Sequence, residues 1–324
     1  MFSYDDLNIH RLMVGDEPRT RSFERSIRST VRKGDVVLDV GAGSGILSLF
    51  AAQAGAARVY AVERAPVAAA LARRLIAENG FADVIQVLPM DMDNLWIPEQ
   101  VAVPVSEWLG VYGVDENMLA PVLQARDRCL KPGGTMIPSV VTAFLAPVKH
   151  PAAEQALQFR GRPYGLDLSA LAPFSPHEVV WLKEPVSAEA LRAEAMPLWV
   201  SDCATMPAAE ARSPYAAELS FPLTGTGVNG FAAWFEAQMP GTEPLSNAPG
   251  QPAMHWGQFL FPVANAADFV AGERLEVGFH NVPASLLGSH HIWASRGKDG
   301  AMEVHDTRKH PDAGSRVPWR AYAE

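Results

Sequence analysis

The sequence contains only two cysteines, Cys129 and Cys203, among 324 residues. Two cysteines cannot build a disulfide framework, and no CxxC or Cys/His spacing typical of a zinc site is present. We therefore expect no metal site. The scarcity of cysteine favours a reducing compartment and predicts a cytoplasmic protein.

Long apolar runs and a secretory leader are also missing. The N-terminal "MFSYDDLNIHRL" lacks a basic region followed by an apolar one, and stretches such as "GILSLFAAQAGAA" are short and interrupted by glycine. A bilayer-spanning helix needs about 20 apolar residues, so neither export nor a membrane partner is expected. The net charge of −9 argues against a nucleic-acid partner and mildly favours cationic substrates.

The residues that are present divide the chain into two halves. Hydrophobic residues make up 48% of the sequence, enough for a full core. Between residues 35 and 138, β-rich runs such as "DVVLDV" alternate with helical stretches such as "PVAAALARRLIAENG". This alternation predicts an α/β domain with a doubly wound, mostly parallel sheet. After Pro138, short runs such as "AELSFPL" and "RLEVGFHNV" alternate apolar with polar residues, which predicts an antiparallel sandwich or barrel.

A glycine-rich loop follows the first expected strand. "VVLDVGAGSGIL" ends the strand at Asp39 and continues through Gly41, Gly43 and Gly45. Glycines allow a backbone to approach a ligand closely. A dinucleotide site typically has the spacing G-x-G-x-x-G. The spacing G-x-G-x-G, with an acid two residues ahead, instead favours a ligand that lacks phosphate and carries an ammonium group, such as S-adenosylmethionine.

Acidic residues after the next strands support this cofactor. Glu63 ends "RVYAVE", where it could accept hydrogen bonds from both ribose hydroxyls, and Asp91, Met92 and Asp93 in "MDMDN" could hold an adenine. The alternative is a tight βα turn at the glycines and a solvated Glu63. The glycine spacing and the acid together favour the cofactor, but do not indicate which group is methylated.

Two glutamates lie nine residues apart in "SEWLGVYGVDENML". Glu107 follows the fourth expected strand, at the edge where open α/β sheets bind ligands, and Glu116 is expected to open the next helix. If residues 108–115 form a hairpin, both acids face one pocket, and a planar guanidinium could bridge their carboxylates. The alternatives are an acid favoured by the helix dipole at Glu116 and local backbone amides bonded to Glu107.

The double-glutamate segment resembles the corresponding loop of the protein arginine methyltransferases. Four other segments match that family in order: "IHRLMVGDEPRT", "VLDVGAGSGILSLFAAQAGAARVYAVE", "ARDRCLKPGGTMIP" and "MHWGQFLFPV". The resemblance implies a Rossmann-like methyltransferase domain, then an antiparallel β-barrel domain with a helical dimerisation arm, and a homodimer. The implied boundaries are cofactor-covering helices at 1–34, the S-adenosylmethionine domain at 35–138, and the barrel at 139–324 with its arm at about 150–178.

The resemblance also implies residue roles. Glu107 and Glu116 would hold the substrate guanidinium and localise its charge, so that the other terminal nitrogen attacks the sulfonium methyl in line. Asp16 and His255 would join the N-terminal helix to the barrel loop and relay a proton, with a purely architectural pair as the alternative. The implied cofactor-binding residues are Tyr4, His10, Met13, Arg19, Asp39, Gly41, Gly43, Gly45, Glu63, Asp91, Met92, Asp93 and Glu107.

Three positions depart from the family pattern. Val111 replaces a usual tyrosine, Met254 a usual threonine and Ala102 a frequent aspartate, which suggests an altered pocket mouth. We expect a guanidino N-methyltransferase with arginine in a protein or peptide as the default acceptor. Free arginine or another metabolite is a close alternative. Two further alternatives are a methyltransferase of a non-guanidine molecule with a glutamate as general base, and a cofactor-binding dimeric scaffold without turnover.

Overall fold

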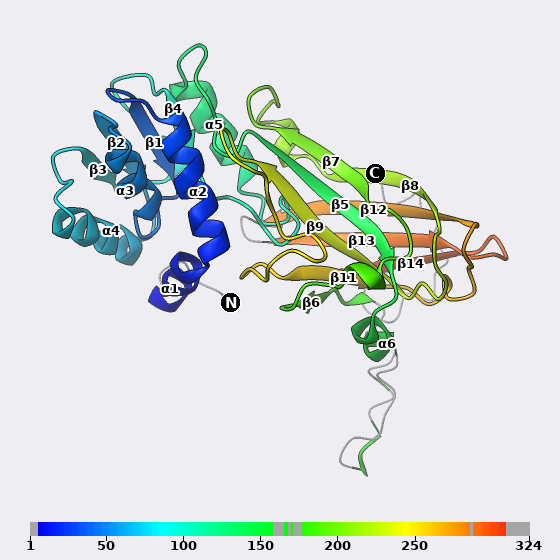
Figure 1. Cartoon of the computed structure of the whole chain (residues 1–324). Helices are drawn as coiled ribbons and strands as arrows, with labels where there is room; N and C mark the ends of the chain where they lie inside the picture. The colour runs from blue at the N-terminus through cyan, green and yellow to red at the C-terminus, as the bar shows by residue number, and fades with distance from the viewer. Residues whose placement is uncertain (1–5, 158–164, 168–169, 171–176, 286–287, 309–324) are drawn as a thin grey trace.

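The computed structural model describes residues 6–157, 165–167, 170, 177–285 and 288–308. A parallel sheet with its helices forms one part of the molecule, and two antiparallel sheets form the other (Figure 1). The predicted fold class, a Rossmann-like α/β domain followed by an antiparallel β domain, is confirmed.

Two helices precede the parallel sheet. The second lies between that sheet and the antiparallel sheets, and the first lies at its lower end in the view of Figure 1. α1 spans Leu7–Gly15 and α2 spans Glu17–Thr30. Asp16 ends the first helix and caps the second, since its carboxylate accepts from the backbone N–H of Arg19 at 3.3 Å. Pro18 in the first turn of α2 also favours a helix start there.

The parallel sheet consists of β1 (Val36–Val40), β2 (Arg58–Val62), β3 (Ile85–Leu88) and β4 (Val103–Val105), in the order β3-β2-β1-β4. Its helices are α3 (Ile46–Gln53), α4 (Pro66–Glu78) and α5 (Leu119–Cys129), with a 3-10 turn, η1, at Met92–Asn94. The strand order reverses between β1 and β4. Ligands of open α/β sheets bind outside the carboxyl ends of the strands at this switch point.

The first antiparallel sheet contains β5 (Val140–Val148), β6 (Val180–Leu182), β7 (Met196–Asp202), β9 (Gly230–Gln238), β10 (Leu245–Ser246) and β11 (Gln258–Pro262). The second contains β8 (Tyr215–Pro222), β12 (Arg274–Ser285), β13 (Gly288–Arg296) and β14 (Met302–Asp306). Short 3-10 turns occur at Ala188–Ala190 and Glu210–Arg212. Fully buried aromatic rings fill the space between the sheets. Among them are Phe261 and Phe279, whose ring centroids lie 4.8 Å apart.

Helix α6, Pro151–Leu157, begins the segment expected to form an arm at about 150–178. Most of that segment lies outside the described residues. α2 contacts the antiparallel part directly, because the hydroxyls of Ser26 and Ser29 donate to the carbonyl of Pro240 at 2.9 and 3.1 Å.

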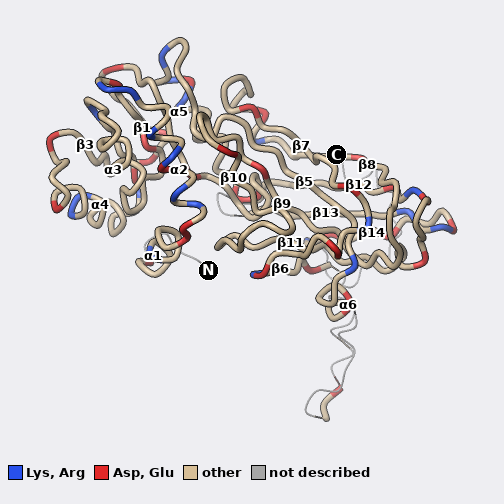
Figure 2. The backbone as a smooth tube through the Cα atoms, in the orientation of Figure 1, with Lys and Arg blue, Asp and Glu red and all other residues tan. Residues whose placement is uncertain are grey.

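Charged residues of both signs are interspersed along the chain (Figure 2). Within the described residues, no helix has the length and apolar character needed to cross a bilayer. The same part of the chain holds no group of three His, Cys, Asp or Glu side chains suited to a metal ion.

Candidate functional site

A cavity opens at the carboxyl edge of the parallel sheet, beside the switch point. Its empty space, including the part open to solvent, is about 1120 Å³. The walls come from α1 and α2, the glycine loop, the end of β2, the segment after β4 and the segment before β11. Ten of the predicted site residues line it: His10, Met13, Arg19, Gly41, Gly43, Glu63, Met92, Glu107, Glu116 and His255.

The glycine loop depends on backbone conformations that side chains disfavour. Gly41, Gly43 and Gly45 have φ values of 74°, 53° and 80°. A Cβ on Gly43 would lie 3.2 Å from the ring of His10, so this glycine lets α1 close over the loop. A Cβ on Gly45 would lie 3.3 Å from Ala72 in α4. Gly45 thus serves packing behind the loop and does not line the cavity.

Glu63 is fixed at the cavity wall by two backbone amides. Its Oε2 accepts from the N–H of Gly43 at 2.8 Å, and its Oε1 accepts from the N–H of Ala65 at 2.7 Å. The residue is only 7% exposed, so it is not a solvated strand end. An ionised carboxylate offers about four acceptor sites, which leaves capacity for two ribose hydroxyls.

Asp39 lies beneath the loop and does not line the cavity. It is fully buried, and its Oδ2 accepts from the hydroxyl of Ser48 at 2.6 Å. Burial raises the pKa of Asp39 to about 7, although the hydrogen bond from Ser48 acts in the opposite direction and the negative charge of Glu63 adds to the rise. At neutral pH this position does not hold a full negative charge, so its contribution to binding an ammonium group is indirect.

The predicted adenine residues divide between wall and surface. Met92 lines the cavity, whereas Asp91 and Asp93 do not. Asp91 caps the short turn, accepting from the backbone of Asp93 at 3.0 Å, and lies 3.8 Å from Arg64. Tyr4 lies outside the described residues.

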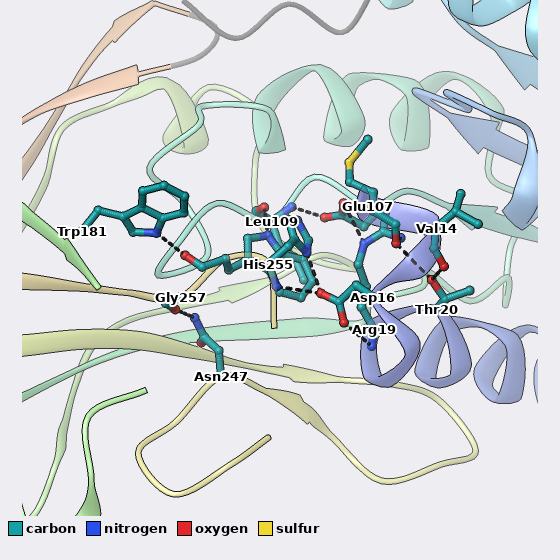
Figure 3. Close-up of polar contacts among 12 residues, drawn as sticks. Val14, Asp16, Arg19, Thr20, Glu107, Leu109, Trp181, Asn247, His255 and Gly257 are labelled. Carbon is teal, nitrogen blue, oxygen red and sulfur yellow. Dashed lines mark hydrogen bonds and ion pairs between the residues drawn. The ribbon is translucent and has the colours of Figure 1, made fainter. Parts of the chain in front are cut away.

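The segment after β4 is a hairpin, which is the condition under which the two glutamates were expected to face one pocket. Gly110 and Gly113 exchange backbone hydrogen bonds of 3.1 Å in both directions. Both glutamates therefore reach the same cavity. Glu107 contacts Arg19, whose Nη2 and Nε donate to Oε2 at 2.8 and 3.2 Å (Figure 3). Its Oε1 accepts from the backbone of Leu109 at 3.0 Å.

Glu116 does not open a helix, which corrects the sequence expectation. α5 begins at Leu119, with Met118 as its N-cap. Asn117 has φ 58°, a left-handed conformation that a helix cannot include. The helix-dipole explanation for Glu116 is therefore wrong. Met13 of α1 and Met118, the N-cap of α5, both line the cavity.

The predicted pair of Asp16 and His255 is in contact. The Nδ1 of His255 lies 2.7 Å from Oδ2 of Asp16, and the backbone N–H of His255 donates to the same oxygen at 2.8 Å (Figure 3). Burial alone would raise the pKa of Asp16, but the hydrogen bonds from His255 outweigh it, and the pKa is lowered from 3.8. An ionised Asp16 thus joins the start of α2 to the segment before β11.

Sequence reasoning missed the residues that hold the hairpin from the barrel side. Trp256 donates through Nε1 to the carbonyl of Leu109 at 2.7 Å, and Asn247 donates through Nδ2 to the carbonyl of Val111 at 2.8 Å. Trp256 lies within the quoted "MHWGQ" segment, so its motif carried a signal. Asn247 follows a two-residue strand and has no local signal in the sequence.

Comparisons with known proteins divide the chain at the same place as its sheets. Residues 14–141 match a sequence profile described as ribosomal protein L11 methyltransferase. Residues 140–286 match a profile described as arginine methyltransferase oligomerization subdomain.

Curated relatives match most of the chain. It is 37% identical over 269 residues to protein arginine N-methyltransferase 6 of Xenopus laevis, covering 79% of this chain and 78% of that protein. It is 33% identical over 303 residues to protein arginine N-methyltransferase 6 of Danio rerio, covering 90% of this chain and 86% of that protein.

Solved structures show the same relationship. A PRMT1 enzyme-prozyme heterotetrameric complex with AdoHcy from Trypanosoma brucei has a TM-score of 0.82 and 28% identity, covering 94% of this chain and 99% of that chain. Protein arginine methyltransferase 10 of Arabidopsis thaliana has a TM-score of 0.79 and 26% identity, covering 94% of this chain and 99% of that chain.

Proposed function

The chain belongs to the protein arginine N-methyltransferase family, and from that premise we propose how its own residues methylate arginine. The enzyme transfers a methyl group from S-adenosylmethionine to a guanidino nitrogen, with arginine in a protein or peptide as the acceptor. One observation carries the assignment. Glu107 and Glu116, from opposite arms of one hairpin, line the same cavity as Glu63 and the glycine loop.

The cavity residues fit S-adenosylmethionine. Glu63 offers a fixed carboxylate to the ribose, Gly41 and Gly43 bring the backbone close, and Arg19 offers a guanidinium to the ligand carboxylate. When bound, this cofactor supplies an electrophilic methyl group on a positively charged sulfur that is a good leaving group. Arg19 has five N–H donors, so it can bind a ligand carboxylate while still contacting Glu107.

The two glutamates carry out the acceptor chemistry. Bidentate contacts from Glu107 and Glu116 hold a guanidinium flat and concentrate its positive charge on the nitrogens that they contact. The remaining terminal nitrogen then keeps lone-pair density for the transfer. Catalysis of this kind is mostly positioning and electrostatics. We assign the Asp16 and His255 pair to joining α2 and the barrel segment, supported by the double contact of His255 with one carboxylate oxygen.

The acceptor is tested by incubating the protein with methyl-labelled cofactor and three pools: arginine-rich peptides, free arginine and cell-extract metabolites. Mass spectrometry then identifies what becomes labelled. We expect label on the arginine side chains of the peptides. Label confined to free arginine or to metabolites would reject a protein acceptor. These two pools are included because Val111, at the hairpin tip, replaces the tyrosine that is usual in the family. Cofactor binding by calorimetry with no labelled product would support a scaffold instead.

We further propose a homodimer, supported by the match of residues 140–286 to an oligomerization subdomain. Light scattering should then give twice the chain mass of 35.0 kDa. A cytoplasmic location is supported by Cys129 and Cys203, both buried as free thiols. The division into 1–34, 35–138 and 139–324 is supported by β1 beginning at Val36 and β5 beginning at Val140.

A further inference from the structure

Glu116 lies between two neighbours that are each fastened to other parts of the molecule. On one side, Asp115 is buried behind the hairpin. Its carboxylate accepts from the backbone N–H groups of Tyr112 at 3.0 Å and Val111 at 3.2 Å, and its own carbonyl accepts from the hydroxyl of Ser289 in β13 at 2.9 Å. The residue before Glu116 is therefore fixed both to the hairpin and to the barrel.

On the other side, Asn117 holds a conformation that its side chain stabilises. Its φ of 58° is the one positive value of a non-glycine residue in the described part of the chain. Asparagine tolerates this region better than most residues, at a cost in strain that surrounding contacts must offset. Its Nδ2 donates to the carbonyl of Gly288 at 2.7 Å, and its Oδ1 lies 3.1 Å from the hydroxyl of Ser289.

These contacts give the two glutamates different supports. Glu107 is held from the α/β side, by Arg19 and the backbone of Leu109. The backbone on either side of Glu116 is held from the barrel, through the first residues of β13. The distance between the two carboxylates therefore depends on where β13 places Asn117.

We propose that Asn117 and Ser289 are positioning residues for Glu116: together they hold its backbone so that its carboxylate meets the substrate guanidinium at a fixed spacing from Glu107. The inference rests on the proposed function of the two glutamates as a guanidinium clamp. Neither Asn117 nor Ser289 lines the cavity. A misplacement of about 1 Å at a reacting group can lower a rate by about a hundredfold, so contacts that hold the backbone of Glu116 in place should affect turnover strongly.

The test uses the full-length protein and three substitutions. Asn117→Gly keeps the left-handed backbone without strain but removes both side-chain contacts. Ser289→Ala removes the hydroxyl, and Ser289→Thr restores one. Ser220→Ala is the matched control, because Ser220 is also a strand serine of the second antiparallel sheet and its hydroxyl contacts Glu276 at 2.6 Å, outside the cavity lining.

We expect kcat for an arginine peptide to fall about tenfold or more in Asn117→Gly and Ser289→Ala, while the Kd for the cofactor stays within about twofold. Ser289→Thr should recover most of the activity, and Ser220→Ala should match the wild type. Unchanged kcat in both Asn117→Gly and Ser289→Ala would overturn the inference. A loss of cofactor affinity as large as the loss of kcat would also overturn it, because a general structural role lowers both quantities.

Hydrogen exchange of the backbone amides of residues 113–119 tests the positioning role of Asn117 and Ser289 independently of catalysis. That role predicts faster exchange there in Asn117→Gly and Ser289→Ala, with unchanged exchange in β1 and β2. Exchange equal to that of the wild type would overturn the positioning role. If the wild-type protein methylates no arginine acceptor, the proposed function fails, but hydrogen exchange still shows whether Asn117 and Ser289 order the backbone around Glu116.

Discussion

Replacing Glu107 by glutamine should damage both stability and transfer, because the substitution breaks a buried ion pair. The side chains of Arg19 and Glu107 are 6% and 10% exposed, and their closest contact is 2.8 Å. Removing one partner of a buried pair costs about 3–5 kcal/mol, since the other charge stays buried without compensation. Glutamine still accepts one hydrogen bond, so we expect the lower end, about 3 kcal/mol. At about 2 °C per kcal/mol for a chain of this size, the Tm of the ligand-free protein should fall by about 6 °C.

Glu116→Gln is the informative comparison. Both substitutions should largely abolish transfer, because each removes half of the guanidinium clamp. Glu107 bonds directly to Arg19, the residue proposed to bind the cofactor carboxylate. The Kd for the cofactor should therefore change by about tenfold in Glu107→Gln and by less than about twofold in Glu116→Gln. Glu78→Gln is the control, since its pair with Arg74 is exposed and contributes about 0–1 kcal/mol.

The assays are calorimetric titration with the cofactor, thermal unfolding without it, and methyl transfer to an arginine peptide. The reasoning is refuted if Glu107→Gln keeps the Tm and cofactor affinity of the wild type, or if Glu116→Gln loses cofactor affinity to the same extent. Wild-type transfer rates in both variants would refute the clamp itself.

Three further predictions concern other contacts. His255→Asn keeps a side-chain donor towards Asp16, so an architectural pair predicts kcat within about threefold of the wild type and an unchanged pH profile; loss of one limb of the profile would indicate proton transfer instead. Tyr112→Phe removes the donor to Asn281 (2.9 Å), which should cost about 1–3 kcal/mol in urea unfolding and leave the cofactor Kd unchanged. The pKa of Asp39 is raised from 3.8 to about 7, so the folded state binds more protons than the unfolded state between these values. Its contribution to the free energy of unfolding, about 4 kcal/mol, should be lost as pH rises from about 4 to 7, and Asp39→Asn should remove that pH dependence; equal slopes for both proteins would contradict the raised pKa.

The parallel half of the molecule could be predicted from local patterns. Apolar runs such as "VVLDV" are bounded by charged residues and glycines, and the spacing of Gly41, Gly43 and Gly45 requires a turn with positive φ. The hairpin at residues 108–115 entered the sequence analysis only as a condition, and the bridge between Gly110 and Gly113 meets that condition. In these segments the local conformational preferences agree with the final fold, which is the condition under which sequence reasoning succeeds.

Contacts between distant segments could not be predicted in the same way. Arg19 and Glu107 are 88 residues apart, and only the family resemblance indicated that both lie in one site. The start of α5 was misplaced because nothing local in "DENML" shows that Asn117 takes a left-handed conformation. That conformation depends on Gly288 and Ser289, which are more than 170 residues away. The burial of Asp39 likewise depends on α3, whose Ser48 covers it.

Under the proposed function, the barrel contributes to the acceptor site, although most of the residues proposed to bind the cofactor come from the α/β half and its leading helices. The hairpin that carries both glutamates is bonded to the barrel along its length, at Leu109 by Trp256, at Val111 by Asn247 and at Asn117 by Gly288. A free loop of this length would sample many conformations, and ordering each residue costs about 1–2 kcal/mol in backbone entropy. The contacts with the barrel order the hairpin in the free protein, so substrate binding does not have to supply this free energy. In the proposed site, the α/β half and its leading helices bind the cofactor, and the barrel fixes the geometry of the acceptor site. Substitutions in the barrel should therefore lower kcat more than they weaken cofactor binding.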